Sequence, residues 1–181
     1  YKRQGHETRA TSTDRKGVPM RWIDDGFRRQ PIPYLLQSLM AFAVVAVLVV
    51  VLGALTHGAV VAALGASTFI VFAMPSRDTA RPRSLIGGHA VSMALGLLCS
   101  VPLRWGWVDS GIALALLGAV AVSLSLFAMV VFDMEHPPAA GNALAFATST
   151  LAWGHVGFTL SAVLLLALVR RLLRGWLRDL A

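Results

Sequence analysis

The sequence predicts an all-α protein, a polytopic membrane bundle of about six membrane segments, two of them short. Of its 181 residues, 56% are hydrophobic and 14% are charged, and the mean hydropathy is +0.68. A soluble domain has about 45–50% apolar and about 25% charged residues. The charges also leave four long uncharged blocks, at 30–76, 84–103, 110–132 and 136–169. Because a helix needs about 20 apolar residues to cross a bilayer, this pattern excludes an ordinary soluble domain, a disordered chain and a collagen-like chain.

The first 33 residues are expected to form a basic segment on the cytoplasmic side, ahead of a membrane domain over 34–175 and a short tail, 176–181. Between Met20 and Arg29, apolar and charged residues alternate. That pattern indicates either a stretch lying in the membrane interface or a solvated tail. The net charge of +7 falls mostly at the segment ends, where anionic lipid headgroups and membrane topology place Lys and Arg. We therefore expect lipid contact and no nucleic acid.

Three segments are predicted in the first half of the chain. The first, 35–55, is an almost pure run of Val, Leu and Ala, and a tight turn at 56–58 ends it. The second, 59–73, is shorter and rich in small residues, and it stops before Pro75. The third, 85–103, follows a loop that contains three arginines.

The second half is predicted to repeat this arrangement after an aromatic link at 104–110. A segment at 111–132 is followed by 139–152, a turn at 153–155 and a last segment at 156–174. At about 1.5 Å per residue, a helix over 139–152 would reach only about 21 Å, which is short for a bilayer core of about 30 Å.

The distribution of positive charge decides the number of crossings. Cytoplasmic loops carry an excess of Lys and Arg. The basic N-terminal segment, the loop at 77–83 and the C-terminal arginines at 170–178 should therefore all lie inside, which requires an even number of crossings. Counting 139–152 as a crossing gives six. Together with the Ala, Leu, Val and Arg-rich composition and the lack of a transit-peptide pattern, this leads us to expect a bacterial inner membrane with both termini in the cytoplasm.

Six crossings divide into two groups of three, which suggests an inverted repeat. In each half the middle segment is short, rich in small residues and introduced by a histidine, His57 in the first and His136 in the second. Paired, interrupted segments at matching positions are the best sequence indication of a transporter's midplane site.

The stretch from Glu135 to Asn142 is the first candidate site. Pro137 and Pro138 suit the first turn of a helix, where a missing N–H has no partner anyway, so we expect His136 at or just before a helix start. The free N–H groups of such a turn favour an anion, and Gly141 lets a ligand or another backbone approach closely. The alternative is a helix cap at the membrane edge, with the histidine at the interface.

Two further candidates lie inside the predicted segments. The hydroxyls of Ser67 and Thr68 could donate to a bound anion, or they could bond back to their own helix at a helix interface. We favour the second interpretation for Thr68, and for Ser67 both stay open. His89 follows Gly87 and Gly88 one turn into a segment, where an ionisable group is costly unless it is paired or hydrated. It is a functional candidate, and a satisfied interfacial histidine is the alternative.

The sequence gives little support for catalysis, disulfide formation or metal binding. The chain has no zinc-protease, dithiol, hydrolase or phosphate-loop motif, and its single cysteine excludes an intramolecular disulfide. A metal site at Asp133, Glu135 and His136 is disfavoured because their spacing falls in an irregular turn with no supporting thiolate. We expect no enzyme activity, no cofactor and no metal.

These motifs together resemble the HPP family of integral membrane proteins, over about 35–175. The resemblance rests on His136-Pro137-Pro138 followed by Ala139-Ala140-Gly141, on Leu64-Gly65-Ala66-Ser67, and on Pro82-Arg83 followed by Gly87-Gly88-His89. The family is usually described with four membrane spans, and a plastid member is linked to nitrite transport. The resemblance therefore implies a small-anion transporter whose motif positions are occupied here by Gly65, Ser67, Arg83, Gly87, Gly88, His89, His136, Pro137, Pro138 and Gly141. Asn142 stands where a small or hydroxyl residue is often found, and its amide could add a donor or change the substrate.

The resulting hypothesis is a transporter or channel for a small inorganic anion, with nitrite as the best guess. The anion would lie where the starts of the two short helices meet, held by N–H groups near Gly141 and Gly65 and helped by Ser67, Asn142 and a histidine. A positive charge on a histidine would strengthen binding as the pH falls, since an unperturbed histidine titrates near pH 6.5, about the middle of the physiological range. The alternative is a non-transporting membrane sensor or assembly module whose motifs serve helix packing. A homo-oligomer is expected in either case.

Overall fold

The structure, a computed structural model, describes residues 28–52, 58–108, 110–150 and 153–180, with the backbone alone for 45–52. This part of the chain is helical throughout and contains no strand. The longer helices are α2 (Pro31–Leu52), α3 (Gly58–Ala73), α4 (Pro82–Cys99), α6 (Gly111–Val131), α7 (Ala140–Ala147) and α8 (Trp153–Leu173). Short helical turns are η1 (Asp78–Ala80), α5 (Val101–Arg104) and η2 (Pro137–Ala139).

Within the described residues, two helices are long and apolar enough to cross a membrane, α6 and α8, each of 21 residues. The shorter apolar helices are α3 and the stretch 31–44 of α2. The outer surface of α6 is strongly apolar: Ile112 is 78% exposed and Phe127 is 69% exposed. Several polar side chains are instead completely buried, among them Ser67, His89, Ser125, His136 and Asn142. An apolar exterior, with polar side chains buried in the interior, suits a lipid environment.

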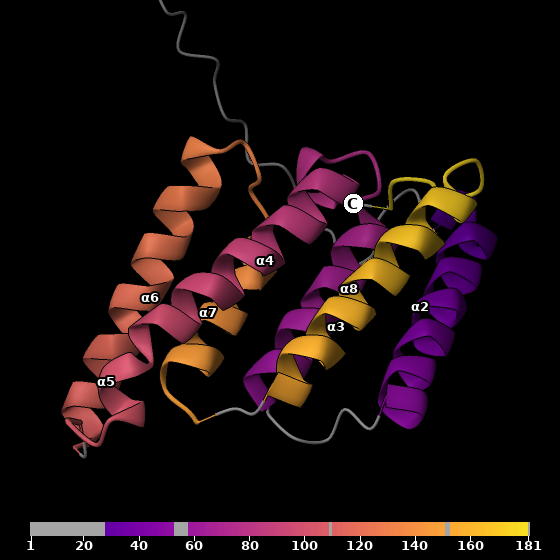
Figure 1. The fold of residues 1–181 in the computed structure, drawn as a ribbon. Coiled ribbons are helices and arrows are strands. Elements are labelled where there is room, and N and C mark those ends of the chain that lie inside the picture. The colour runs from indigo at the N-terminus through magenta and orange to yellow at the C-terminus, as the bar shows by residue number, and fades with distance from the viewer. Residues whose placement is uncertain (1–27, 53–57, 109, 151–152, 181) are drawn as a thin grey trace, which may run out of the picture.

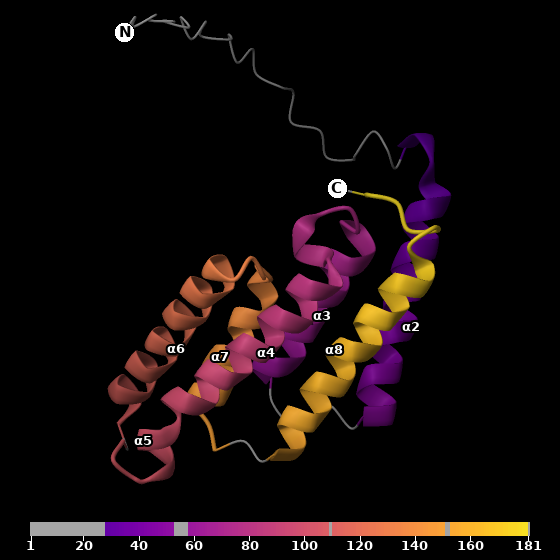
Figure 2. The ribbon, with the colours of Figure 1, turned by 45° about the horizontal axis from the view of Figure 1, so that its top comes forward.

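The helices lie side by side with α6 and α2 at the two edges, and α3, α4, α7 and α8 between them (Figures 1 and 2). The start of α2, the loop between α3 and α4, the end of α6 and the C-terminal tail meet at one end of the bundle (Figure 1). Hydrogen bonds join these parts, including one from Arg83 to the Phe132 carbonyl (2.9 Å) and one from the Leu180 N–H to the Ala73 carbonyl (2.8 Å). Among the described residues, the start of α2, the 77–83 loop and the C-terminal segment thus lie at the same end of the bundle.

Most of the predicted segments correspond to observed helices. The 35–55 segment is α2, which starts four residues earlier at Pro31, and the 85–103 segment is α4 followed by the short α5. The helix α4 begins with Pro82 in its first turn, and α6 begins where the Ser110 hydroxyl accepts a hydrogen bond from the Ala113 N–H (3.2 Å). The predicted turn at 56–58 and the predicted interfacial stretch at 20–29 fall almost wholly outside the described residues. His57 also lies outside them.

Two predictions in the second half were wrong. A helix over 139–152 is not formed, because α7 ends at Ala147 and its eight residues span only about 12 Å. The hydroxyls of Thr148 and Ser149 bond back to the last turn of α7, which satisfies carbonyl groups that a longer helix would use. The predicted turn at 153–155 is instead the first turn of α8. A glycine costs little in a first turn, where the N–H groups have no partner within the helix.

The helices α4 and α7 pack very closely where α4 contains Gly96. A Cβ atom at this position would lie 2.7 Å from the Ala143 carbonyl oxygen and 2.9 Å from the Phe146 Cβ. Because Phe146 and Ala143 are fully buried, this contact belongs to the centre of the bundle. Glycine is therefore required for α7 to reach its position.

The chain after α8 folds back across the shared end and is held there by Gln37 of α2. The Gln37 amide nitrogen donates to the Arg178 carbonyl (2.9 Å), and its oxygen accepts from the Arg178 N–H (2.9 Å). The same nitrogen also contacts the Phe72 carbonyl. The segment predicted as a C-terminal tail is thus docked against α2 and α3.

Candidate functional site: a buried histidine pair

His136 lies in the irregular segment that returns from the end of α6 into the bundle. Asp133 adopts a positive φ of 54°, which turns the chain inward, and His136 directly precedes η2. Its side chain is completely buried, and Nδ1 lies 2.7 Å from the Thr79 carbonyl oxygen in η1. The expected position just before a helix start is confirmed. His136 is the residue that caps η2, but its imidazole makes no capping bond and is buried.

His89 and Ser67 complete a connected set of polar side chains. The Ser67 hydroxyl lies 2.9 Å from Nε2 of His89 and 2.8 Å from Nε2 of His136. The Asn142 amide nitrogen lies 2.6 Å from Nδ1 of His89. The two imidazole rings are 5.1 Å apart between centroids. We call Ser67, His89, His136 and Asn142 the histidine network; all four are completely buried and come from α3, α4, the segment before η2, and α7.

The positions of the hydrogen atoms follow from the partners. The Thr79 carbonyl can only accept, so Nδ1 of His136 carries a hydrogen and its Nε2 is an acceptor while the ring is neutral. The Asn142 amide nitrogen donates to Nδ1 of His89, so the hydrogen of a neutral His89 is on Nε2 and is donated to Ser67. Every nitrogen of both rings therefore has a partner.

The Ser67 hydroxyl has one hydrogen and two acceptors within reach. These are Nε2 of His136 and the Ala63 carbonyl of its own helix, each 2.8 Å away. A proton added to Nε2 of His136 would remove this competition, because His136 would then donate to Ser67 and Ser67 to Ala63. The histidine network thus has a defined place for one additional proton. Among the described residues, the Asn142 amide oxygen is buried without a hydrogen-bond partner.

Glycines allow these elements to meet. A Cβ atom at Gly88 would lie 2.7 Å from the His136 Cβ, so only glycine lets α4 pack against the segment that carries His136. At Gly141 a Cβ would lie 3.2 Å from the Ala63 Cβ, which brings α7 close to α3. The expectation that Gly141 permits close approach is confirmed, and the neighbour at both glycines is another part of the protein.

Three predicted site residues lie apart from the histidine network. The Thr68 hydroxyl donates to the Leu64 carbonyl of its own helix (2.9 Å), as the favoured interpretation required. Gly65 is exposed, and a Cβ atom there would meet nothing within 4 Å. The hypothesis placed this glycine near the start of a short helix, but it lies in the middle of α3. Arg83 is exposed at the shared end, with Nη1 3.7 Å from an Asp133 carboxylate oxygen.

The backbone at the start of η2 differs from the expected anion cradle. Pro137 and Pro138 hold this turn but have no N–H groups. The Ala139 N–H donates to the His136 carbonyl (2.9 Å) and is already occupied. These positions therefore offer an anion no free backbone N–H group.

Sequence reasoning missed the Thr79 carbonyl, which fixes the orientation of His136. Any residue could supply a carbonyl at this position, so the sequence carries no signal for it.

Comparison with known proteins assigns the family. The family model described as "HPP, transmembrane region" matches residues 28–176. The chain belongs to the HPP family. This HPP protein is 36% identical over 84 residues to a protein of Dictyostelium discoideum named as a transmembrane protein, covering 46% of the chain and 28% of that relative. A second Dictyostelium discoideum protein with the same kind of name is 35% identical over 79 residues, covering 44% of the chain and 24% of the relative.

The chain thus spans about a quarter of the length of these curated relatives. No solved structure matches it. The family and the relatives identify a membrane protein, as the resemblance of the motifs implied.

Proposed function

We propose that this HPP protein is a transporter or channel for a small inorganic anion, with nitrite as the best guess. The observation that carries the proposal is the histidine network, two completely buried histidines joined through one serine hydroxyl. Ionisable groups inside membrane proteins are costly and typically mark an ion or proton pathway.

The chemistry of the network suits an anion once a proton is added. With His136 protonated, Nε2 of each imidazole is a hydrogen-bond donor, and the group carries a positive charge in a low-dielectric interior. Nitrite offers oxygen acceptors and a single negative charge. Entry of the anion with a proton would leave the interior neutral, so we propose proton-coupled or pH-dependent transport.

The arrangement of helices supports a six-segment inverted repeat as part of this proposal. In this repeat α2 corresponds to α6, α3 to α7 and α4 to α8. The contact between α2 and α3 then has its counterpart in the contact between α6 and α7, and the contact between α4 and α7 has its counterpart in that between α8 and α3. Ser67 and His89 belong to the first half, and His136 and Asn142 to the second. A site at the interface of two inverted repeats is the usual place for substrate in secondary transporters.

The proposed setting is a bacterial inner membrane with both termini in the cytoplasm. The arginines at the shared end of the bundle support this orientation, since cytoplasmic loops are rich in Lys and Arg. The exposed apolar face of α6 would then contact lipid or a second copy of the chain.

The second candidate is a non-transporting membrane module, and the glycine contacts favour it. At Gly88 and Gly96 the neighbouring segments fill the space that a side chain would need, as in helix packing motifs. In that case the histidine network would fix the fold, and replacing His136 would change assembly or expression instead of flux.

The test is nitrite uptake into proteoliposomes that contain the full chain. Empty vesicles and the variants His136→Ala and Thr68→Val are run in parallel, with nitrate and chloride as competitors. The external pH is kept near neutral or above, because nitrous acid crosses lipid unaided. Thr68→Val is the matched control, since it removes a neighbouring buried hydroxyl that bonds only its own helix.

Saturable uptake that is lost in His136→Ala and retained in Thr68→Val supports transport through the network. Uptake equal to that of empty vesicles for every anion, from protein shown to be folded, overturns the proposal and favours the packing module. In a separate pH series the passive leak into empty vesicles is subtracted at each pH. Protein-dependent flux that stays constant between about pH 5.5 and about pH 8, a range centred near the ordinary histidine pKa, would refute the proton-coupled part alone.

A further inference from the structure

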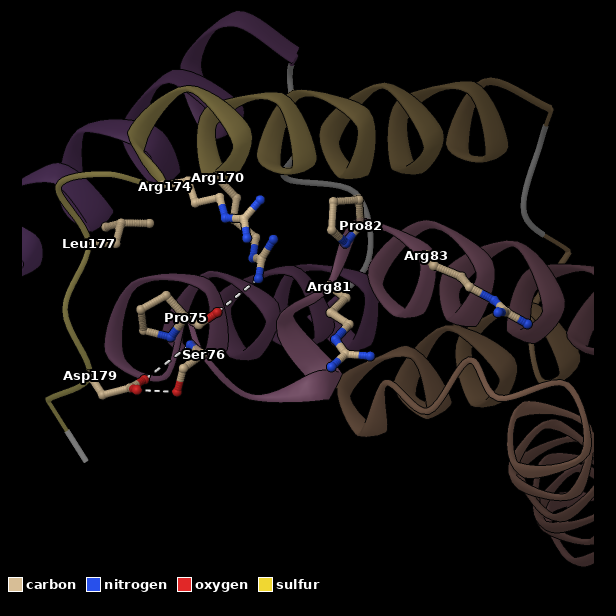
Figure 3. Close-up of a pocket in the computed structure, with 9 residues that line it drawn as sticks. All are labelled: Pro75, Ser76, Arg81, Pro82, Arg83, Arg170, Arg174, Leu177 and Asp179. Atoms are coloured by element: carbon tan, nitrogen blue, oxygen red, sulfur yellow. Dashed lines mark hydrogen bonds between the residues drawn. The ribbon is translucent and has the colours of Figure 1, made fainter.

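A pocket of about 670 Å³ opens at the shared end of the bundle, between the end of α8 and the loop that follows α3. Figure 3 shows Arg170, in α8, and Arg174, just after it, extending toward Pro75 and Ser76. Arg81 lies on the other side of the space. The lining residues are Pro75, Ser76, Arg81, Pro82, Arg83, Arg170, Arg174, Leu177 and Asp179.

The pocket is strongly positive. Four guanidinium groups line it against a single carboxylate, that of Asp179, which accepts hydrogen bonds from the backbone N–H and the hydroxyl of Ser76. Arg81 is partly neutralised by Asp78, with Nη2 and Oδ1 2.6 Å apart. The Arg83 guanidinium extends away from the other three in Figure 3 and donates to the Phe132 carbonyl (2.9 Å).

Arg170 and Arg174 have no carboxylate partner among the described residues. Arg170 donates through Nη2 to the Pro75 carbonyl (2.8 Å), and its buried Nε has no hydrogen-bond partner in the described part of the chain. The charges that act on Arg170 are those of Arg174 and Arg81, which are of the same sign. Arg174 makes no hydrogen bond or ion pair with any described residue, so its guanidinium donors are available.

We propose that this pocket binds a phosphate group that carries two negative charges. Arg170 lies in the last turn of α8 and Arg174 directly follows the helix, and both side chains line the same space. The planar guanidinium fork matches the oxygens of a phosphate with two parallel hydrogen bonds. A doubly charged anion would offset the repulsion between the arginines and supply acceptors for the unfilled donors. The Ser76 hydroxyl lies in the same lining.

This site is separate from the histidine network and does not depend on anion transport. None of its lining residues belongs to the network, and its ligand carries more charge than nitrite. The phosphate could be free in solution, or it could be the monoester headgroup of a lipid such as phosphatidic acid. The chemistry of recognition is the same, so the experiment must separate the two sources.

The first arm measures binding of inorganic phosphate to the full chain in detergent by isothermal titration calorimetry, against chloride at matched ionic strength. Arg174→Gln should weaken binding at least about tenfold, the effect of removing one charged hydrogen-bonded partner. Arg171→Gln is the matched control, because it removes the same charge from the same end of α8, where the side chain is exposed and outside the pocket lining. Arg81→Gln is a second test: it should also weaken phosphate binding, and because the Arg81 side chain is exposed, its loss should leave the fold intact.

The second arm measures thermal unfolding in nanodiscs of phosphatidylcholine, alone or with phosphatidic acid or phosphatidylglycerol. Phosphatidylglycerol serves as control because its phosphodiester carries one charge. Binding of free phosphate that depends on Arg174 supports the proposal with a soluble ligand. Stabilisation by phosphatidic acid alone, lost in Arg174→Gln and kept in Arg171→Gln, supports it with a lipid headgroup.

Two results would overturn the proposal. One is that neither free phosphate nor phosphatidic acid binds to folded protein. The other is that Arg171→Gln weakens binding as much as Arg174→Gln, which would show a general surface attraction. Gel filtration of each variant without ligand confirms that it is folded.

Discussion

Replacing Ser67 with alanine should destabilise the protein by removing the atom that joins the two histidines. The hydroxyl connects to Nε2 of His89 and to Nε2 of His136, which come from different segments, so two bonds between segments are lost together. Such bonds in membrane proteins are worth about 0.6 kcal/mol on average and up to about 1.7 kcal/mol each. We therefore expect the free energy of unfolding to fall by about 1–3 kcal/mol.

The measurement is the free energy of unfolding in mixed micelles, followed by circular dichroism as SDS is titrated against a mild detergent. Thr68→Val is the control, since it removes the next hydroxyl along α3, which is also buried but bonds only the Leu64 carbonyl of the same helix. This variant should lose less than about 1 kcal/mol, as expected for one neutral hydrogen bond.

A double-mutant cycle identifies the pair that carries the effect. If Ser67 and His136 are bonded as the distance of 2.8 Å indicates, the effects of Ser67→Ala and His136→Ala should not add. The reasoning is refuted if Ser67→Ala costs no more than Thr68→Val, or if the two network variants are fully additive.

Three other predictions concern packing and the C-terminal tail. Gly96→Ala should lower the free energy of unfolding by about 1–3 kcal/mol, because the new Cβ meets a backbone oxygen at 2.7 Å. Gly65→Ala, whose Cβ has no neighbour within 4 Å, should raise it by up to about 1 kcal/mol. The melting temperatures of the two variants in detergent test this difference. Gln37→Ala should release the tail, seen as faster hydrogen exchange of the backbone amides after α8. Hydrogen bonds from Ser76 lower the pKa of Asp179. The contact between the Asp179 carboxylate and Ser76 is therefore complete above the unfolded carboxyl pKa of about 3.9 and is lost as the pH falls through the lower folded value. Hydrogen exchange of the Ser76 amide, measured against pH, should show this loss, and Asp179→Asn should abolish the pH dependence.

The sequence predicts the helices well where composition changes sharply. The charged residues and prolines around Pro82 and Ser110 mark real helix starts, and Pro31 marks one that the hydropathy pattern placed four residues too late. The end of α7 was missed because no glycine, proline or charge interrupts the apolar run there. The local signal was the hydroxyl run from Thr148, whose side chains bond back to the helix.

The hypothesis of two short helices that meet placed Ser67, Asn142 and one histidine together, but it did not pair His89 with His136. The cost of a buried histidine singled out His89, and the two prolines singled out His136, but nothing in one sequence shows that they meet. Ser67 is separated along the chain by 22 residues from His89 and by 69 from His136, so their contact depends on how the helices pack. That packing is set by glycines at positions such as Gly88, whose role becomes visible only when the opposing segment is in place.

The division of the histidine network between the two halves of the chain has a consequence for biosynthesis. Ser67 and His89 leave the ribosome well before His136 and Asn142, so the first half enters the membrane with the imidazole of His89 lacking its amide partner. An unpaired imidazole in lipid is costly, and the early helices cannot settle until residues 136–142 arrive to pair with them. A chain interrupted before Asp133 would therefore leave the imidazole of His89 without this partner, whereas completion of the second half pairs the buried polar side chains.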